Sequence, residues 1–171
     1  MNAYYDECKH FKTNEGKDDF REQIQPYLSN FGWEYSVDEY LNQQFIFEHS
    51  YLDANMISII ENLQSQGVKC FLATDQERYR AQYLLESMNF RSVFDAHFIS
   101  CFIGFRKCHD RFWEFVIDEL KNSTVCYESD EIAFFDDNQK NIDTALKFGI
   151  KAFLFETMSK FRTDISLLGL I

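Results

Sequence analysis

Residues 131–155, EIAFFDDNQKNIDTALKFGIKAFLF, decide how the chain folds. The apolar run 132–135 has the length of a short buried strand and stops at two adjacent carboxylates, Asp136 and Asp137. Apolar side chains then recur at helical spacing, and residues 151–155 form a second apolar run of strand length. This pattern predicts a strand-helix-strand unit. Because ligands of open α/β sheets bind beyond the carboxyl ends of the strands, the two acids stand where a site is expected.

The two acids allow two interpretations. Neighbouring side chains of an extended backbone point in opposite directions, so one carboxylate can face a cleft while the other turns toward the helix start. Together Asp136 and Asp137 could hold a hard cation such as Mg²⁺ through oxygen ligands. Alternatively, one of them only caps the helix, a common use of Asp at a strand-to-helix junction.

Composition limits the class of protein. The 171 residues suffice for one domain, or for one core with a small inserted subdomain, and 18% aromatic residues indicate a packed core. The net charge of -11 argues against general binding of nucleic acids or anionic membranes, because the field of the whole protein repels polyanions. A small phosphorylated substrate remains possible where a local cation and a lysine offset that field.

Cysteine usage and hydropathy predict the compartment. Five Cys without CxxC spacing favour neither a disulfide framework nor a zinc site, which fits reduced thiols in the cytoplasm. No apolar run approaches the ~20 residues of a membrane span, and the amino terminus lacks a signal pattern. We therefore expect a soluble, cytoplasmic protein that interacts with neither membranes nor nucleic acids.

The rest of the chain alternates between predicted helices and strands. Ser36 and Glu39 form a capping-box pattern at one helix start, Pro26 marks a kink or an end in the preceding helix, and Gly67 is a good C-cap. This alternation predicts an α/β protein, a three-layer sandwich with a parallel sheet. The predicted helices span 18–28, 36–45, 54–66, 77–87, 111–120 and 161–168, and the predicted strands before residue 131 span 68–73 and 94–99.

Three strand ends or loops carry polar residues in the order Thr74, Lys107 and the acidic pair. Each alone has a structural explanation: a threonine at a strand end, a lysine on a solvated surface, an aspartate as a helix cap. A hydroxyl, a lysine and carboxylates at the same sheet edge would form a cradle for a phosphate and a metal ion.

The chain resembles the haloacid dehalogenase-like (HAD) hydrolase superfamily of the small helical cap type. FLATDQ resembles the family's second motif, GFRKCHDRFWEFVIDEL its third, and IAFFDDNQKNIDTALKFGIKAFLF its fourth. The resemblance implies a parallel, Rossmannoid sheet with a partial helical cap. Residues 1–53 would form the amino-terminal segment and the partial cap, and residues 54–171 the α/β core.

The resemblance also implies roles for single residues. Thr74 would hydrogen-bond the phosphoryl oxygens and Lys107 would neutralise phosphate charge, whereas Asp137 would bind Mg²⁺ with Asp136 alongside. Two positions depart from the family pattern: Asp75 stands where Asn is common, and Cys108 stands where Pro often follows the lysine.

The family's first motif is the serious departure. Members begin with a central strand that ends in Asp-x-Asp, where the first Asp attacks the substrate and the second is the general acid and base. The best match is residues 4–8, YYDEC, but Cys8 stands where the second Asp belongs, and Asp6 lies only 68 residues before Thr74. We therefore expect the first motif to be missing. The amino-terminal segment, a second chain through self-association, or a longer gene product could then fill the gap.

These observations predict a phosphatase-type HAD-like domain that is inactive or incomplete as written, since without a nucleophile the remaining groups bind but cannot attack. Two alternatives stay open: an active Mg²⁺-dependent phosphatase of small phosphorylated metabolites, and a non-catalytic domain that binds a ligand or a protein. Mg²⁺ binding would be weak or absent if the first motif is missing.

Overall fold

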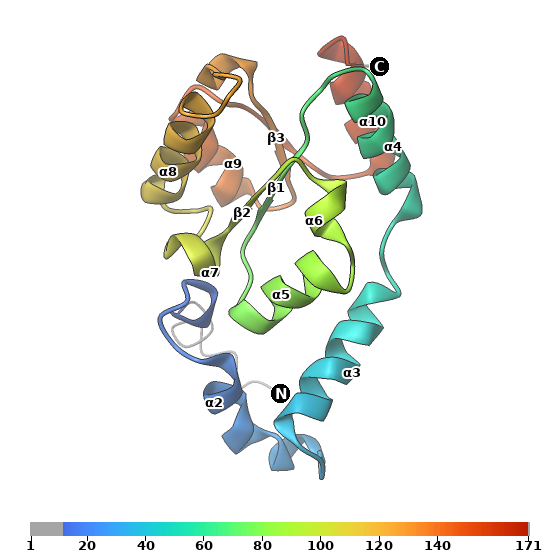
Figure 1. Cartoon of the computed structure of the whole chain (residues 1–171), viewed down its shortest axis with the longest axis vertical. Coiled ribbons are helices and arrows are strands. Elements are labelled where there is room, and N and C mark those ends of the chain that lie inside the picture. The colour runs from blue at the N-terminus through green and yellow to red at the C-terminus, as the bar shows by residue number, and fades with distance from the viewer. Residues whose placement is uncertain (1–11, 171) are drawn as a thin grey trace. The chain divides into compact units, whose positions relative to one another are not determined.

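The structure, a computed structural model, describes residues 12–170. The chain divides into two compact units, Met1–Gly104 and Phe105–Ile171. Each unit combines helices with one pair of parallel strands (Figure 1). The expected α/β class with parallel strands is thereby confirmed.

The first unit contains the predicted helices with their predicted signals. Ser36 and Glu39 form the capping box of α3, and Gly67 takes a left-handed conformation just after α4. Pro26 lies in a 3-10 helix that follows α2 directly. In chain order the described elements are α2 (Phe20–Ile24), the 3-10 helices η1 (Gln25–Tyr27) and η2 (Ser29–Phe31), α3 (Val37–His49), α4 (Ala54–Ser65), β1 (Phe71–Thr74), α5 (Arg78–Glu86), α6 (Phe90–Val93), β2 (Ala96–Ile99) and α7 (Ser100–Ile103).

The parallel pair β1–β2 is the framework of this unit. Phe71 is paired with Ala96 and Thr74 with Ile99, and α5 and α6 form the crossover between the two strands. Leu72 of β1 packs against a buried cluster contributed by these helices, which consists of Leu84, Met88 and Phe90. The packing places Thr74 at the carboxyl end of β1.

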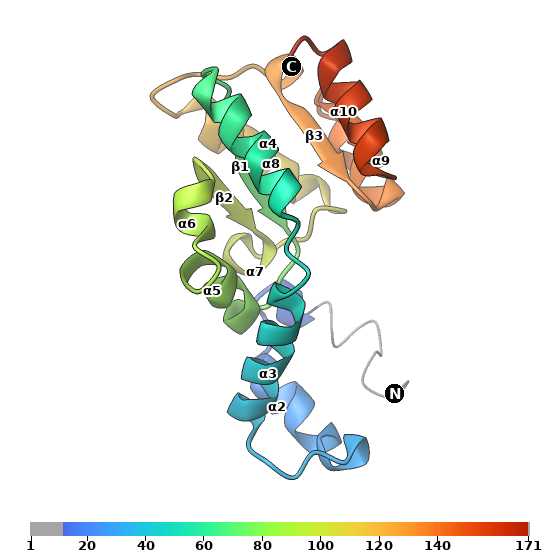
Figure 2. The ribbon, with the colours of Figure 1, turned by 90° about the vertical axis from the view of Figure 1, so that its right-hand side faces the viewer.

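The second unit contains the strand-helix-strand pattern from which the sequence analysis began. Figure 2 shows β3 together with α9 and α10. The Phe135 ring of β3 stacks on Phe153 of β4 with centroids 5.1 Å apart, and Phe161 of α10 meets it edge-on at 4.8 Å. The elements are α8 (Asp110–Lys121), the 3-10 helix η3 (Ser129–Glu131), β3 (Ala133–Asp136), α9 (Gln139–Leu146), β4 (Lys151–Leu154) and α10 (Met158–Leu167).

The described strands of residues 12–170 form two pairs, β1 with β2 and β3 with β4. Residues 4–8, the best match to the first motif, lie outside the described residues. The predicted boundary between residues 53 and 54 falls between α3 and α4 and stays a prediction.

Two short helices and one helical face differ from expectation. Helices α6 and α7 have four residues each, too few for a helical period to show in the sequence. On α8 the sequence pattern places Phe112, Phe115, Val116 and Leu120 on one side of the helix, but the structure leaves Phe115 exposed and buries Trp113. Within residues 12–170 the structure contains no helix long and apolar enough to cross a membrane.

We predict that Gly16→Ala destabilises the protein by about 3 kcal/mol, because the added methyl group would overlap backbone that cannot easily move. Gly16 has φ +66°, and a Cβ there would lie 2.3 Å from the carbonyl oxygen of Cys101. Gly67→Ala is the matched control: φ is +87° but the space around it is open, so only the backbone strain of about 1 kcal/mol remains. Urea unfolding of both variants measures the difference, and equal losses would contradict the predicted overlap.

Candidate functional site

A buried ion pair lies at the carboxyl end of β3. Lys107, in the segment before α8, donates from Nζ to Oδ2 of Asp136 over 2.5 Å. The Lys107 side chain is only 12% exposed and that of Asp136 only 3%. Two charges so far removed from water are tolerated when they are paired and hydrogen-bonded.

Asp136 receives two further hydrogen bonds. Its Oδ1 accepts the backbone N–H of Asn138 at 2.8 Å and the side-chain amide of Asn141 at 3.0 Å. Asn138 is also the N-cap of α9, where its side chain accepts the N–H of Lys140. Asp136 therefore ties the end of β3, the start of α9 and Lys107 together, and both of its oxygens accept hydrogen bonds within the protein.

Asp137 stands in a different environment. It follows β3 directly and is exposed, whereas Asp136 beside it is buried. Mg²⁺ is commonly held by one or two carboxylates together with waters and substrate phosphates. Among the described residues no group of three or more His, Cys, Asp or Glu is arranged to hold a metal ion. The residues present thus fit a cation held mainly by Asp137, water and a phosphate.

A tryptophan of α8 holds the backbone of Lys107 in place. Trp113 of α8 donates from Nε1 to the carbonyl oxygen of Lys107 at 2.8 Å, and its ring lies 4.6 Å from that of Phe134 of β3. Trp113 is 2% exposed, so this hydrogen bond is sheltered from water. Sequence reasoning missed this role of Trp113. The available signal was a tryptophan six residues after the lysine, on the face of α8 that packs against the strand.

Thr74 belongs to the first compact unit, whereas Lys107, Asp136 and Asp137 belong to the second. Thr74 is half-buried at the end of β1, where Gln76 donates from Nε2 to its Oγ1 at 3.4 Å. The N–H of Gln76 donates to Oγ of fully buried Ser100, which follows β2. The loop after β1 is thereby held at the ends of both strands.

The thiols of Cys70 and Cys101 do not supply an alternative nucleophile. Burial raises the pKa of the Cys70 thiol and of the Cys101 thiol to about 11 in each case. Both thiols are protonated at neutral pH, and a protonated thiol is a poor nucleophile.

Comparison with known proteins identifies the class to which this fold and site belong. A family model described as haloacid dehalogenase-like hydrolase matches residues 4–149, which is most of the chain. The chain therefore belongs to the haloacid dehalogenase-like hydrolase family, as its sequence motifs indicated. No curated protein sequence matches it significantly.

Solved structures of the family share the fold. A HAD-like family hydrolase from Porphyromonas gingivalis is similar over 98% of this chain and 82% of its own, with a TM-score of 0.74 and 19% identity. A variant of a HAD family enzyme from Bacteroides thetaiotaomicron, in complex with magnesium and inorganic phosphate, is similar over 94% of this chain and 85% of its own (TM-score 0.67, 13% identity). The HAD-hydrolase YfnB from Bacillus subtilis, bound to magnesium, covers 97% of this chain and 83% of its own (TM-score 0.63, 14% identity).

We predict that the adjacent aspartates differ sharply in their effect on stability. Asp136→Ala should lower the free energy of unfolding by about 3 kcal/mol, because Lys107 stays buried after losing this carboxylate. Asp137→Ala, the matched control, should stay close to wild type, because that side chain is exposed. Urea unfolding of the two variants gives both values. A larger loss for Asp137→Ala would show that the structural role has been assigned to the wrong residue.

Proposed function

We propose that this chain is a phosphatase-type domain that binds small phosphomonoesters. Lys107 would neutralise phosphate charge, and Asp137 would hold Mg²⁺. For Thr74, which belongs to the other compact unit, the family resemblance implies a hydrogen bond to the phosphoryl oxygens. The observation that carries the proposal is the buried Lys107–Asp136 pair with exposed Asp137 directly beside it. The ion pair with Asp136 holds the ammonium of Lys107 at the carboxyl end of β3.

We further propose that the chain, as written, binds such esters without hydrolysing them. Phosphoryl transfer in this family needs an acceptor for the phosphoryl group, and no Asp-x-Asp precedes Thr74. A lysine, a hydroxyl and a cation position the group and neutralise its charge, but they do not attack it.

One observation favours a second candidate, an active phosphatase that uses Asp6. The family match begins at residue 4 and so includes the segment YYDEC, in which Asp6 is the only aspartate. The short spacing from Asp6 to Thr74 speaks against this candidate. It is the alternative that the activity experiment below distinguishes.

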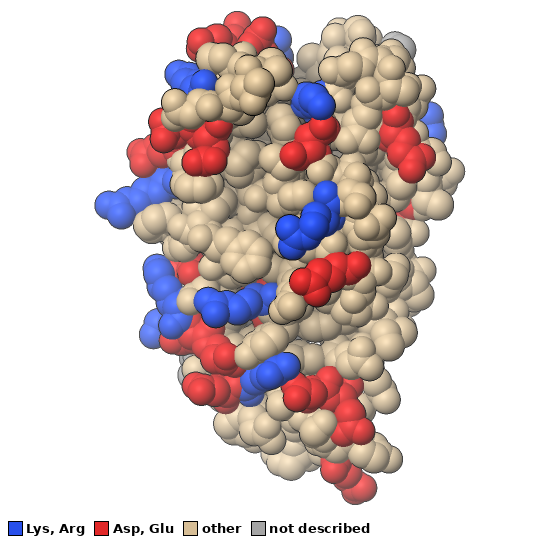
Figure 3. All heavy atoms as spheres, viewed as in Figure 1, with Lys and Arg blue, Asp and Glu red and all other residues tan. Residues whose placement is uncertain are grey.

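The charge of the protein supports a small ligand over a polyanion. The formal net charge is -11. On the face drawn in Figure 3, Lys and Arg side chains stand singly or in small groups among Asp and Glu instead of forming a continuous basic area. Such a surface does not attract nucleic acid, whereas one lysine and one bound cation suffice for one phosphate group.

We expect Mg²⁺ to bind weakly, because Asp136 is committed to Lys107, Asn138 and Asn141, leaving Asp137 as the available carboxylate of the pair. Calorimetric titration should give weak binding that Asp137→Ala abolishes. Asp143→Ala, which removes an exposed acid on α9, serves as control and should leave the titration unchanged. Tight, submillimolar binding that Asp137→Ala removes would contradict the missing-motif interpretation.

We also expect that wild-type protein hydrolyses para-nitrophenyl phosphate no faster than its Asp137→Asn variant. Stabilising the transition state does not lead to hydrolysis unless some residue accepts the phosphoryl group. Release of nitrophenolate with and without Mg²⁺ measures both rates.

The deciding control is Asp6→Asn. If Asp6 is the nucleophile, wild type shows Mg²⁺-dependent hydrolysis with a trappable phosphoenzyme, and Asp6→Asn abolishes both. That result would replace the binding-only proposal by the active phosphatase.

A further inference from the structure

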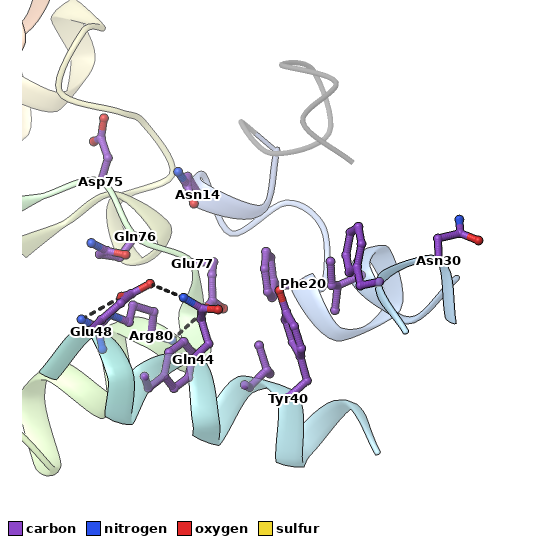
Figure 4. A pocket seen from close by; sticks show the side chains of 14 residues that line it. Asn14, Phe20, Asn30, Tyr40, Gln44, Glu48, Asp75, Gln76, Glu77 and Arg80 are labelled. Carbon is purple, nitrogen blue, oxygen red and sulfur yellow. Dashed lines mark hydrogen bonds and ion pairs between the residues drawn. The ribbon is translucent and has the colours of Figure 1, made fainter. Parts of the chain in front are cut away.

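Helix α3 is apolar on two sides, and the protein covers only one of them. On the inner side Leu41 and Phe45 are buried. Tyr40 and Glu48 also belong to the inner side, where they line a cavity of the first unit (Figure 4). A helix on the surface of a globular protein normally has a single apolar stripe, and the opposite side is polar. A second apolar side on α3 therefore calls for a partner that covers it.

The uncovered side forms what we name the outer patch: Ile46 and Phe47 of α3, with Tyr51 and Leu52 just after the helix. All four side chains are exposed, Phe47 by 58% and Tyr51 by 71%. The rings of Phe47 and Tyr51 meet edge-on with centroids 5.2 Å apart. Because each residue advances a helix by about 100°, Phe47 points away from buried Phe45. The patch exposes on the order of several hundred Å² of apolar surface, a size that is often functional.

The chain around the outer patch is strongly acidic. Residues 22–68 contain seven Asp or Glu and no Lys or Arg, and they hold seven of the eleven net negative charges of the protein. Asp38 forms an ion pair with Arg21 at 2.7 Å. Glu48 forms one with Arg80 at 3.0 Å. Among the described residues the remaining five acids have no Lys or Arg partner: Glu22, Glu34, Glu39, Asp53 and Glu61.

Two of these five acids lie beside the outer patch. Asp53 is exposed and follows Leu52 directly. Glu39 is exposed on α3, seven residues or about two turns before the patch begins, and so lies on the same side of the helix. Asp53 accepts the N–H of Asn55, and Glu39 accepts the hydroxyl and the N–H of Ser36. Those donors are neutral, so both negative charges stay uncompensated, and the bonds from Ser36 lower the pKa of the Glu39 carboxyl.

These charges decide which partner fits the outer patch. A second copy of the chain would bring the same acids to the interface, and like charges that face each other there repel. A nucleic acid or an anionic membrane would be repelled as well. A partner with apolar side chains and flanking Lys or Arg would remove the patch from water and meet the uncompensated carboxylates at the same time.

We propose that the outer patch is the docking surface for another protein, which presents an amphipathic helix with Lys and Arg beside its apolar face. Helices commonly bind in this way, with apolar side chains of one face as anchors. Phe47 and Tyr51 are the anchors on this chain, because aromatic side chains contribute most to such interfaces. No residue of the outer patch belongs to the proposed phosphate site, so the docking surface does not depend on the proposed function.

Calorimetric titration with two synthetic peptides tests the docking surface. Each peptide has about 18 residues and forms an amphipathic helix with Leu on one face, and the other face carries Lys in one peptide and Glu in the other. At about 0.15 M salt we expect the Lys peptide to bind with a Kd of about 10 μM and the Glu peptide about tenfold more weakly or not at all. Equal affinity for both peptides, or no binding of the Lys peptide, would overturn the inference.

Matched variants separate docking from the general attraction of a cationic peptide to an acidic protein. Phe47→Ser should weaken binding of the Lys peptide about tenfold, and Tyr51→Ser repeats the test outside the helix. Phe115→Ser, the control, removes an exposed ring from α8 in the second unit and should leave the affinity unchanged. Circular dichroism checks that all three variants stay folded. Unchanged affinity in both patch variants, or an equal loss in the control, would overturn the inference.

Sedimentation equilibrium tests the competing occupant, a second copy of the chain. We expect the wild-type protein to be a monomer at the concentrations of the titration, because the acids around the patch repel each other. A dimer that Phe47→Ser abolishes would show that a second copy covers the outer patch, and would overturn the assignment to a basic partner.

Discussion

The hydrogen-bonded ion pair between Lys107 and Asp136 is the constraint on which the candidate site depends. Removing two charges from water is costly, and the structure compensates by giving the Asp136 carboxylate three N–H donors, one of them charged. Those donors come from the segment before α8, from the N-cap of α9 and from within α9. A single carboxylate thus sets where the strand ends, where the helix begins and where the lysine lies.

This arrangement places the two adjacent acids in different environments. Because side chains alternate along an extended backbone, only one of the pair can be drawn into the interior, and here it is Asp136. Asp137 is exposed and keeps its oxygens accessible from solvent. The cap interpretation and the metal interpretation therefore need not compete, since one acid organises the turn while the other can contact a cation.

In each parallel pair of the described strands, one strand ends in a polar residue. Thr74 ends β1 in the first compact unit, and Asp136 ends β3 in the second. Parallel strands are normally buried on both faces and paired within a larger sheet. The family resemblance implies a central strand that bears the nucleophile, and the best match to its motif, residues 4–8, lies outside the described residues.

Local patterns in the sequence were sufficient for much of this description. The capping box at Ser36, the helix end at Gly67, which is left-handed just after the C-cap Gln66, and the strand-helix-strand pattern of residues 131–155 are short-range signals, and the structure shows each of them. The family followed from ordered motifs and the match over residues 4–149 confirms it. Tertiary packing decided the remainder. Contacts between elements far apart in the chain, which no local period in the sequence records, decide three features. They bury Trp113 instead of Phe115 on α8, and they pair Lys107 with Asp136 instead of Asp137. They also decide which groups surround Arg80.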